Sequence, residues 1–366
     1  MKIIYKQNTK LLFIKILLIL FSSSEMYAQE FKVSAYVEAY YAYDNDKNGI
    51  QLRQFSSVAP VRDEFRIDLA QVTGKYTSEK IRGTAVLQFG DIPKYNWPQA
   101  PNEYLQYIQE ANVGFSPVKN LWVDVGYFLT HIGGEGVIRN NYLSSITLLT
   151  VYEPFFQSGI RVSYDFSPKF YGSVYLLNGY NVLADNNKNK SGGLQLGFKP
   201  TPQTEIIYNN ITGNEQAAGS IGKTRIYNDL VIKHSLSNKV DLLLGLDYAV
   251  QEKSKLTDTT KPANVFAGLL SIRYKITPKF FIIGRGEFYK DDDGILSGTF
   301  ADSSGSPKGL KASGFTIGIE HSPFDNTFIR AEARYLKTGN SLNIFSDGTT
   351  RRDYRTELML TSGVEF

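Results

Sequence analysis

The sequence predicts an all-β fold, a transmembrane antiparallel β-barrel of about 16 strands within a range of about 14 to 18. Three observations predict it. Apolar and polar residues alternate with a period of two through long segments, as in strands whose two faces differ. Short and long connections alternate between these segments. No run of about 18 apolar residues follows residue 28, and without such helices only a closed sheet pairs every backbone group inside a bilayer.

Residues 1–28 are typical of a secretory signal peptide. Lys2, Lys6 and Lys10 form a basic region, an apolar stretch interrupted by Lys15 follows, and Ala28 is a small residue before a cleavage site. The alternative is a membrane anchor, but the apolar stretch is too short to cross a core of about 30 Å as a helix. We expect cleavage, which leaves residues 29–366 as a single barrel domain in the outer membrane of a Gram-negative bacterium.

The composition narrows the classes of function. The signal peptide carries four lysines and one glutamate, so its removal lowers the formal net charge from +4 to +1. A nearly neutral chain argues against nucleic acid as a partner. The sequence has no cysteine and no metal-ligand spacing, and we expect no cofactor and no metal. The acidic run at 291–293 lacks the full spacing of a calcium loop.

The strands are predicted in chain order from the alternation. Residues 31–43 form the first strand, a polar loop follows at 44–63, and 64–76 and 81–90 flank a short turn. Further short connections, many with Pro or Asn, are predicted at 116–120, 165–169, 199–203, 237–239, 277–279 and 322–326. Long connections are predicted at 131–157, 179–190, 213–223, 251–263, 290–312 and 337–352. Outer-membrane barrels sort their links in this way, with short periplasmic turns and long external loops.

The last strand is predicted at 354–366. Its apolar residues fall mainly on one parity, and the strand ends on the aromatic Phe366. It resembles the closing strand of an outer-membrane barrel. The resemblance implies that it pairs with the first strand and that barrel-assembly machinery recognises Phe366. The alternative is an edge strand of a soluble sandwich.

On a porin-type barrel the apolar parity faces lipid and the polar parity faces the lumen. The predicted pore-lining residues are Arg82, Glu110, Asp124, Arg161, Arg285, Glu287, Arg330, Glu332, Arg334, Arg355 and Glu357. Unpaired buried charges are too costly for a dry core, so we expect water to reach them. This pattern predicts a water-filled channel; the alternative is a barrel closed by its own ion pairs. Arg330, Arg334 and Arg355 form either an anion track or a salt-bridge ladder.

The long connection at 131–157 is unusually apolar, and such a loop should not lie in water. One interpretation folds it into the lumen, where Glu135, Arg139 and Tyr142 line a constriction. The alternative is a strand that extends above the membrane or forms a subunit contact, so a homo-oligomer stays open.

One stretch resembles a known family. Val123–Glu135 is similar to the OmpL-like outer-membrane β-barrel porins of the Bacteroidetes type, with supporting stretches at 36–44, 140–142, 158–164 and 178–181. The family implies passive diffusion of small hydrophilic solutes or ions through the bilayer-spanning barrel, and no catalytic residues. The alternatives are a non-conducting structural or adhesin barrel and an outer-membrane barrel hydrolase. The three histidines and the lack of a nucleophile motif argue against an enzyme.

Overall fold

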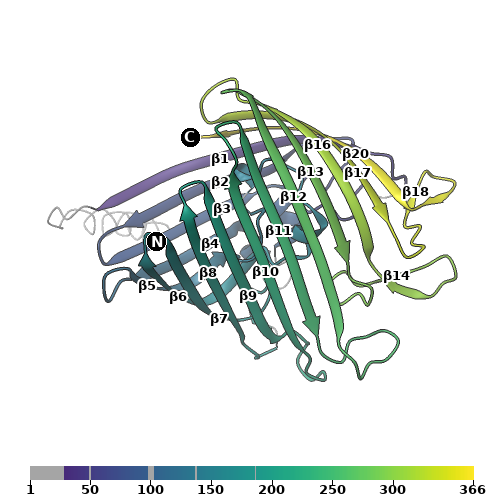
Figure 1. The fold of residues 1–366 in the computed structure, drawn as a ribbon, viewed down its shortest axis with the longest axis horizontal. Coiled ribbons are helices and arrows are strands. Elements are labelled where there is room, and N and C mark those ends of the chain that lie inside the picture. Colours follow the sequence, from purple (N-terminus) through teal and green to yellow (C-terminus); the bar gives the residue numbers. More distant parts are fainter. Residues whose placement is uncertain (1–28, 49–50, 98–102, 137, 186) are drawn as a thin grey trace, which may run out of the picture.

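The structure is a computed structural model that describes residues 29–48, 51–97, 103–136, 138–185 and 187–366 (Figure 1). In this part of the chain, 16 strands close into one antiparallel barrel, which confirms the predicted fold class. The barrel strands are β1 Glu30–Asp44, β2 Phe65–Thr77, β3 Ile81–Phe89, β4 Ile108–Phe115, β5 Leu121–Leu129, β6 Phe156–Ser167, β7 Phe170–Leu177, β8 Ser191–Thr201, β9 Thr204–Asn214, β10 Thr224–Ser235, β11 Val240–Gln251, β12 Ala263–Thr277, β13 Phe280–Lys290, β16 Lys311–His321, β17 Thr327–Thr338 and β20 Tyr354–Glu365. The predicted signal peptide lies outside the described residues.

The remaining elements are short and lie in the long loops. They are the hairpins β14 Thr299–Ala301 with β15 Pro307–Gly309 and β18 Phe345–Ser346 with β19 Arg351–Arg352, the helices α2 Asp91–Asn96 and α3 Leu148–Tyr152, and the 3₁₀ turns η1 Glu103–Tyr107 and η2 Ile138–Asn140. None of the described helices is long and apolar enough to cross a bilayer.

The barrel closes where the first strand meets the last. β1 pairs with β20 from Tyr36 opposite Glu365 to Asp44 opposite Glu357. The amide of Ala35 donates to the carbonyl of Phe366 at 2.6 Å, and the amide of Phe366 donates back at 2.9 Å. The predicted pairing of these two strands is therefore confirmed, and neither strand is left with a free edge.

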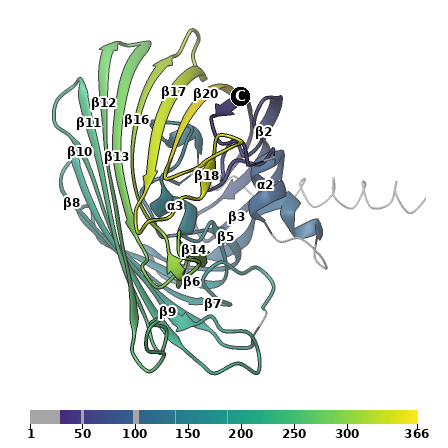
Figure 2. The same ribbon diagram turned by 90° about the vertical axis from the view of Figure 1, so that its right-hand side faces the viewer.

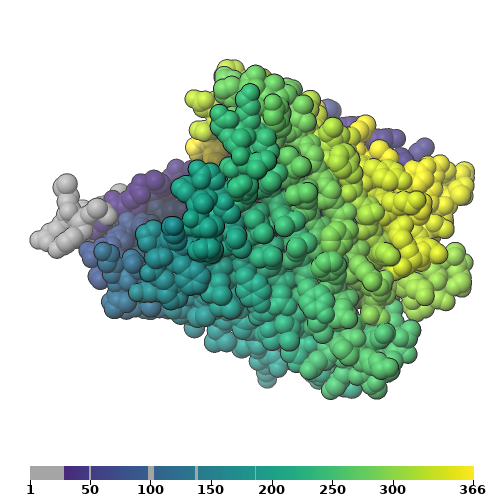
Figure 3. All heavy atoms as spheres, viewed as in Figure 1, coloured from purple at the N-terminus to yellow at the C-terminus, as the bar shows by residue number. Residues whose placement is uncertain are grey.

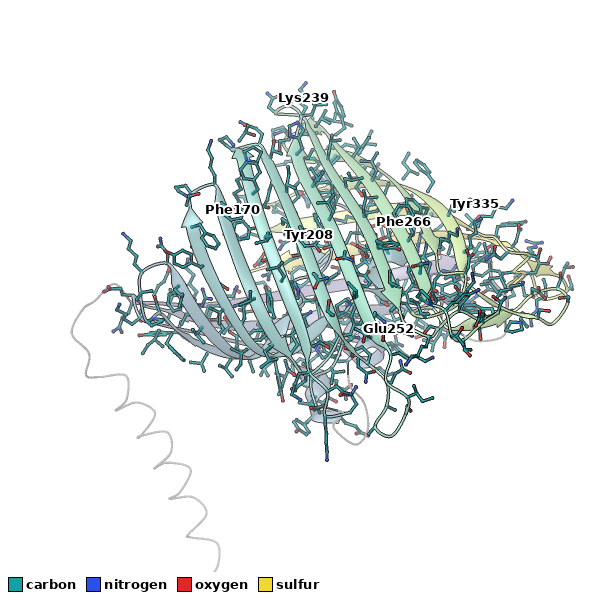
Figure 4. The ribbon with its side chains drawn as sticks, turned by 60° about the horizontal axis from the view of Figure 1, so that its bottom comes forward. Phe170, Tyr208, Lys239, Glu252, Phe266 and Tyr335 are labelled. Carbon is teal, nitrogen blue, oxygen red and sulfur yellow. The ribbon has the colours of Figure 1, made fainter. Side chains whose placement is uncertain are left out.

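Short turns and long loops sort to opposite ends of the barrel, as predicted. In Figure 4, Lys239 marks a short turn at one end and Glu252 marks a long loop at the other. The near wall in Figures 1 and 3 is formed by successive strands of the middle of the chain, which lie side by side in chain order.

The outward parity of the strands forms an apolar band bordered by aromatic residues. Near the short turns the exposed aromatics include Tyr164, Phe166, Phe170 and Tyr274, and near the long loops they include Tyr248, Phe266, Phe288, Phe315 and Tyr335. Figure 4 labels Phe170, Tyr208, Phe266 and Tyr335 on this outer surface. Two aromatic girdles around an aliphatic band are what a bilayer selects on the outside of a barrel.

Two glycines face each other on β5 and β6, the strands that flank the apolar loop. Gly126 on β5 and Gly159 on β6 are register partners, and both have positive φ, 135° and 152°. A Cβ at Gly126 would lie 2.2 Å from the carbonyl oxygen of Ala111, and one at Gly159 would lie 2.0 Å from that of Leu176. Only glycine fits these positions without moving the backbone.

Gly159→Ala is therefore expected to destabilise the barrel by about 1–3 kcal/mol, because the strained φ and the clash with the carbonyl oxygen act together. Urea unfolding of the refolded protein measures the change. Gly284→Ala is the control, because nothing lies within 4 Å of the Cβ it adds. Equal stability of the two variants would show that the backbone at Gly159 adjusts without cost.

Candidate functional site

The connection between β5 and β6, residues 130–155, lies inside the barrel. We call it the inward loop. In Figure 2 its helix α3 is enclosed by strands of the barrel. Its apolar side chains Ile132, Leu148 and Leu149 are buried in a core with inner-face residues of the distant strands β9 to β13. Packing of this apolar segment on the wall takes it out of water.

The start of the inward loop is bonded to the wall at β9 and β10. The Nε2 of His131 lies 3.1 Å from the carbonyl oxygen of Asn210, and its ring stacks on Tyr175 with centroids 4.0 Å apart. Burial lowers the pKa of His131, so the ring is neutral at neutral pH. The amide of Gly133 donates to Asp229 at 2.8 Å. His131 therefore holds the loop against the wall as a hydrogen-bonding and stacking group.

The middle of the inward loop is bonded to carboxylates on the opposite wall. Glu332 on β17 accepts from the amides of Ser144 and Ser145, at 2.5 and 3.2 Å. Glu287 on β13 accepts from the amide of Leu148 at 2.8 Å. These amides are buried, and each would be costly without a partner. The two glutamates therefore fix the path of the loop across the lumen.

Glu135 connects the inward loop to itself and to the wall. Its Oε2 accepts from the amide and the hydroxyl of Thr147, at 2.8 and 2.7 Å, and Thr147 caps α3. Its Oε1 pairs with Arg285 on β13 at 2.7 Å. Arg285 also donates to the carbonyl oxygen and hydroxyl of Ser145. One carboxylate thus joins both halves of the loop to the barrel.

Several of the predicted wall charges form a ladder of ion pairs. Arg334 binds both oxygens of Glu287 at 2.8 Å. Arg355 binds Glu357 at 2.6 Å, and Arg53 from the first long loop binds the same carboxylate. A second group consists of Arg330 and Arg273, both bound to Glu320, at 2.7 and 2.8 Å. Arg330, Arg334 and Arg355 each lie in an ion pair with a glutamate of the wall.

Much of this ladder is covered, which differs from the expectation that water reaches it. Arg285, Arg334 and Arg355 are 1%, 3% and 0% exposed. The reason is that the inward loop and the loop at 45–64 lie against the wall and bring their own partners. Arg53 and Arg62 of that second loop pair with Asp44, at 3.4 and 2.9 Å.

A further group of charged residues, separate from the ladder, stays partly open to the lumen. On β5, Asp124 pairs with Arg82 on β3 at 2.7 Å and with Arg161 on β6 at 3.0 Å. The two arginine side chains are 30% and 28% exposed, while Asp124 is buried. Two guanidinium groups share one carboxylate, so the exposed charge here is positive. Glu110 lies on the same parity of β4 and is half-buried.

The three residues predicted for the constriction lie apart. Glu135 is buried in the middle of the barrel, whereas Arg139 lies 3.2 Å from Glu365, beside the closing strand. The ring of Tyr142 lies 5.7 Å from the guanidinium of Arg273. Arg139 instead lines an open hollow of 820 Å³ at the short-turn end, together with Arg273, Glu320 and Arg330.

The folding of the first long loops into the barrel was not predicted. The loop at 44–63 reads as polar, yet Val58 and Val61 are buried in a core with Ile146 of the inward loop. Trp97, which follows α2, packs on Phe156 with ring centroids 5.0 Å apart. Apolar residues within otherwise polar connections, such as Val58, Val61 and Trp97, are the sequence signals of this packing.

The fold and the inner wall define a class of protein, the outer-membrane β-barrels of porin type. The chain belongs to the family described as "Putative beta-barrel porin-2, OmpL-like", whose model matches residues 30–366. This confirms the resemblance seen in the sequence and places the protein in the outer membrane. A comparison with curated protein sequences gives no match.

The fold is also similar to solved structures. These include the outer membrane channel DcaP of Acinetobacter baumannii, with TM-score 0.61, 11% identity and coverage of 94% of this chain and 100% of that chain. The anion-selective porin from Comamonas acidovorans has TM-score 0.60 and 10% identity, with coverage of 92% of this chain and 100% of that chain. The trimer form of in-vitro folded OmpT of Vibrio cholerae has TM-score 0.59 and 10% identity, with coverage of 93% and 100%. At such identities the likeness concerns the fold alone.

Proposed function

We propose that the protein is a porin for the passive diffusion of small hydrophilic solutes or ions, with the inward loop setting the narrowest part of the path. The observation that carries the proposal is a loop bonded across a barrel of 16 strands, beside charged residues that stay partly exposed. A barrel of this size is too wide for wall side chains alone to fill. The loop narrows it, and the exposed arginines supply the field that an ion meets.

Planar-bilayer recording of the refolded protein tests this function. Discrete conductance steps and a reversal potential in a salt gradient are expected. A folded, inserted barrel without conductance would favour the alternative, a structural or adhesin barrel. An enzymatic barrel is the least supported alternative, because His131 is buried, neutral and bonded to a backbone carbonyl rather than to a nucleophile.

Arg82 and Arg161 are proposed to favour anions. Arg161→Gln removes one exposed positive charge and leaves Asp124 paired with Arg82, so the barrel should fold normally. The ratio of anion to cation permeability is expected to fall by about twofold, because the local field weakens. The reversal potential measures the ratio. Lys308→Gln, an exposed charge on β15, is the control and should leave the ratio unchanged.

Other parts of the proposal concern assembly. We propose that residues 1–28 are cleaved and that the barrel-assembly machinery reads the strand ending at Phe366. Aromatic girdles support the bilayer as the partner of the outer face. A homo-oligomer is supported by the trimer form of one similar structure.

A further inference from the structure

Three carboxylates meet in the middle of the barrel, and we call them the acidic cluster. They belong to Glu153 at the end of α3, Asp229 on β10 and Asp247 on β11. Asp229 and Asp247 are register partners, so the sheet itself holds them side by side. One oxygen from each group lies within 4.8 Å of the others, and all three residues are buried.

In each of the two aspartates, one carboxylate oxygen accepts hydrogen bonds from the protein. Oδ2 of Asp229 accepts from the amide of Gly133 at 2.8 Å and from Asn209 at 2.6 Å. Oδ2 of Asp247 accepts from the hydroxyl of Tyr227. These hydrogen bonds hold the aspartate carboxylates in one orientation. Hydrogen bonds to the ligands of a metal site have the same effect.

The other oxygens have no partner. Oδ1 of Asp229, Oδ1 of Asp247 and Oε1 of Glu153 are buried without a hydrogen bond. These residues are 1%, 1% and 4% exposed. Buried polar atoms are nearly always bonded, and here three unbonded oxygens come from neighbouring groups. Such an arrangement indicates a ligand that they share.

The acidic cluster also lacks a counter-charge. Among the described residues, no Lys, Arg or His nitrogen pairs with any of its carboxylates. Burial, together with the charges of Asp247 and Asp229, raises the pKa of Glu153 well above its usual range. In the ladder, by contrast, the buried carboxylates of Glu287, Glu320 and Glu357 each have an arginine partner.

We propose that the acidic cluster binds a divalent cation, Ca²⁺, which joins the end of the inward loop to the wall at β10 and β11. Ca²⁺ takes oxygen ligands at about 2.3–2.6 Å, so opposite ligands lie up to about 5 Å apart. Three oxygens that all lie within 4.8 Å of one another are compatible with such a ligand set, and the flexible geometry that Ca²⁺ accepts suits them better than the near-ideal octahedron that Mg²⁺ requires.

A cavity of 130 Å³ adjoins the acidic cluster on the side of Glu153. Glu153, Gly133 and Thr130 line it among mostly apolar residues, and Asp229 and Asp247 do not line it. It has room for several water molecules, which would reach the ion from the side of Glu153. Residue 133 has to be glycine for Glu153 to lie where it does, because a Cβ at this position would lie 2.3 Å from Oε2 of Glu153. The proposal concerns the fold of the loop and holds whether or not the barrel conducts.

Thermal unfolding of the full refolded barrel in Ca²⁺ and in EDTA tests the site. Ca²⁺ is expected to raise the unfolding temperature of the wild type, because the ion binds the folded state only. Glu153→Gln should abolish this shift, and so should Asp247→Asn. In EDTA both variants should be at least as stable as the wild type, because each replaces a buried carboxyl group that has no counter-charge.

Direct binding is measured with Tb³⁺, which occupies calcium sites and is excited through a nearby tyrosine. Tyr227 donates to Asp247 and is close enough to serve. Displacement of Tb³⁺ by Ca²⁺ is expected for the wild type, with affinity about tenfold or more weaker in Glu153→Gln, since ligand charge sets affinity. Glu79→Gln, an exposed carboxylate on a short turn, is the matched control and should behave as the wild type.

Two results would overturn the proposal. One is an unfolding temperature of the wild type that Ca²⁺ leaves unchanged, which would mean that the carboxyl groups share protons instead of a cation. The other is the same response of Glu153→Gln and Glu79→Gln to Ca²⁺ and Tb³⁺, which would assign the effect to surface sites. Neither measurement uses conductance, so failure of the cation site and failure of the porin function are distinguished.

Discussion

Replacing residues 131–154 with a linker of four Gly and Ser residues is expected to raise the single-channel conductance by about two- to fivefold, because the barrel loses the segment that narrows it. The replacement is geometrically simple, since Leu129 and Phe156 are register partners at the ends of β5 and β6. The charges that the loop covers, such as Glu287 and Glu332, would then face water, where they are well solvated.

Planar-bilayer recording measures this change, and the control is the same linker placed at 302–306 in the exposed β14–β15 hairpin. The control should leave the conductance unchanged. If the loop replacement also leaves it unchanged, the narrowest part of the path lies elsewhere. The loop at 45–64, which contributes Arg53 and Arg62 to the inner wall, would be the next candidate.

Arg334→Ala is expected to destabilise the barrel by about 3–5 kcal/mol, because it leaves a buried carboxylate without its charge partner. Arg334 holds Glu287 through two bonds of 2.8 Å and lies 3.7 Å from Glu357. Glu357 keeps Arg355 and Arg53, so the loss falls mainly on Glu287. The loss of unfolding free energy is measured by urea unfolding, with the fluorescence of the two tryptophans of the chain as the signal.

The same strand offers a matched control. Lys337 on β17 lies 3.6 Å from Asp353, and the two side chains are 56% and 38% exposed. Lys337→Ala should cost less than about 1 kcal/mol, because exposed pairs contribute little. Adding Glu287→Gln to Arg334→Ala should recover part of the loss, since the amide oxygen still accepts from Leu148. Equal losses for Arg334→Ala and Lys337→Ala would show that the ladder is not a stabilising element.

The sequence predicts the barrel well because its strands repeat one simple rule. A period of two assigns each residue to lipid or to the interior, so the inward positions of Arg330, Glu332 and Arg334 follow from one strand alone. Turn residues mark the short connections in the same local way.

The partners of the inward charges are not encoded locally. Glu135 meets Arg285 across 150 residues, and Arg53 meets Glu357 across 304 residues. The alternation along a strand predicts which face of the sheet a residue lies on, but not whether a loop covers that residue in the folded protein. The acidic cluster shows the same limit, because Glu153 belongs to a loop whereas Asp229 and Asp247 belong to two strands.

The bonds of the inward loop also impose an order of assembly. Its amides are bound by Asp229, Glu287 and Glu332, and the hydroxyl of Ser144 by Thr361. All four partners follow the loop in the chain, at separations of 96 to 217 residues. Contacts of such range need the intervening chain to be in place. We therefore expect the loop to dock only after β10, β13, β17 and β20 are present, and a barrel without the docked loop to be wider than the finished one.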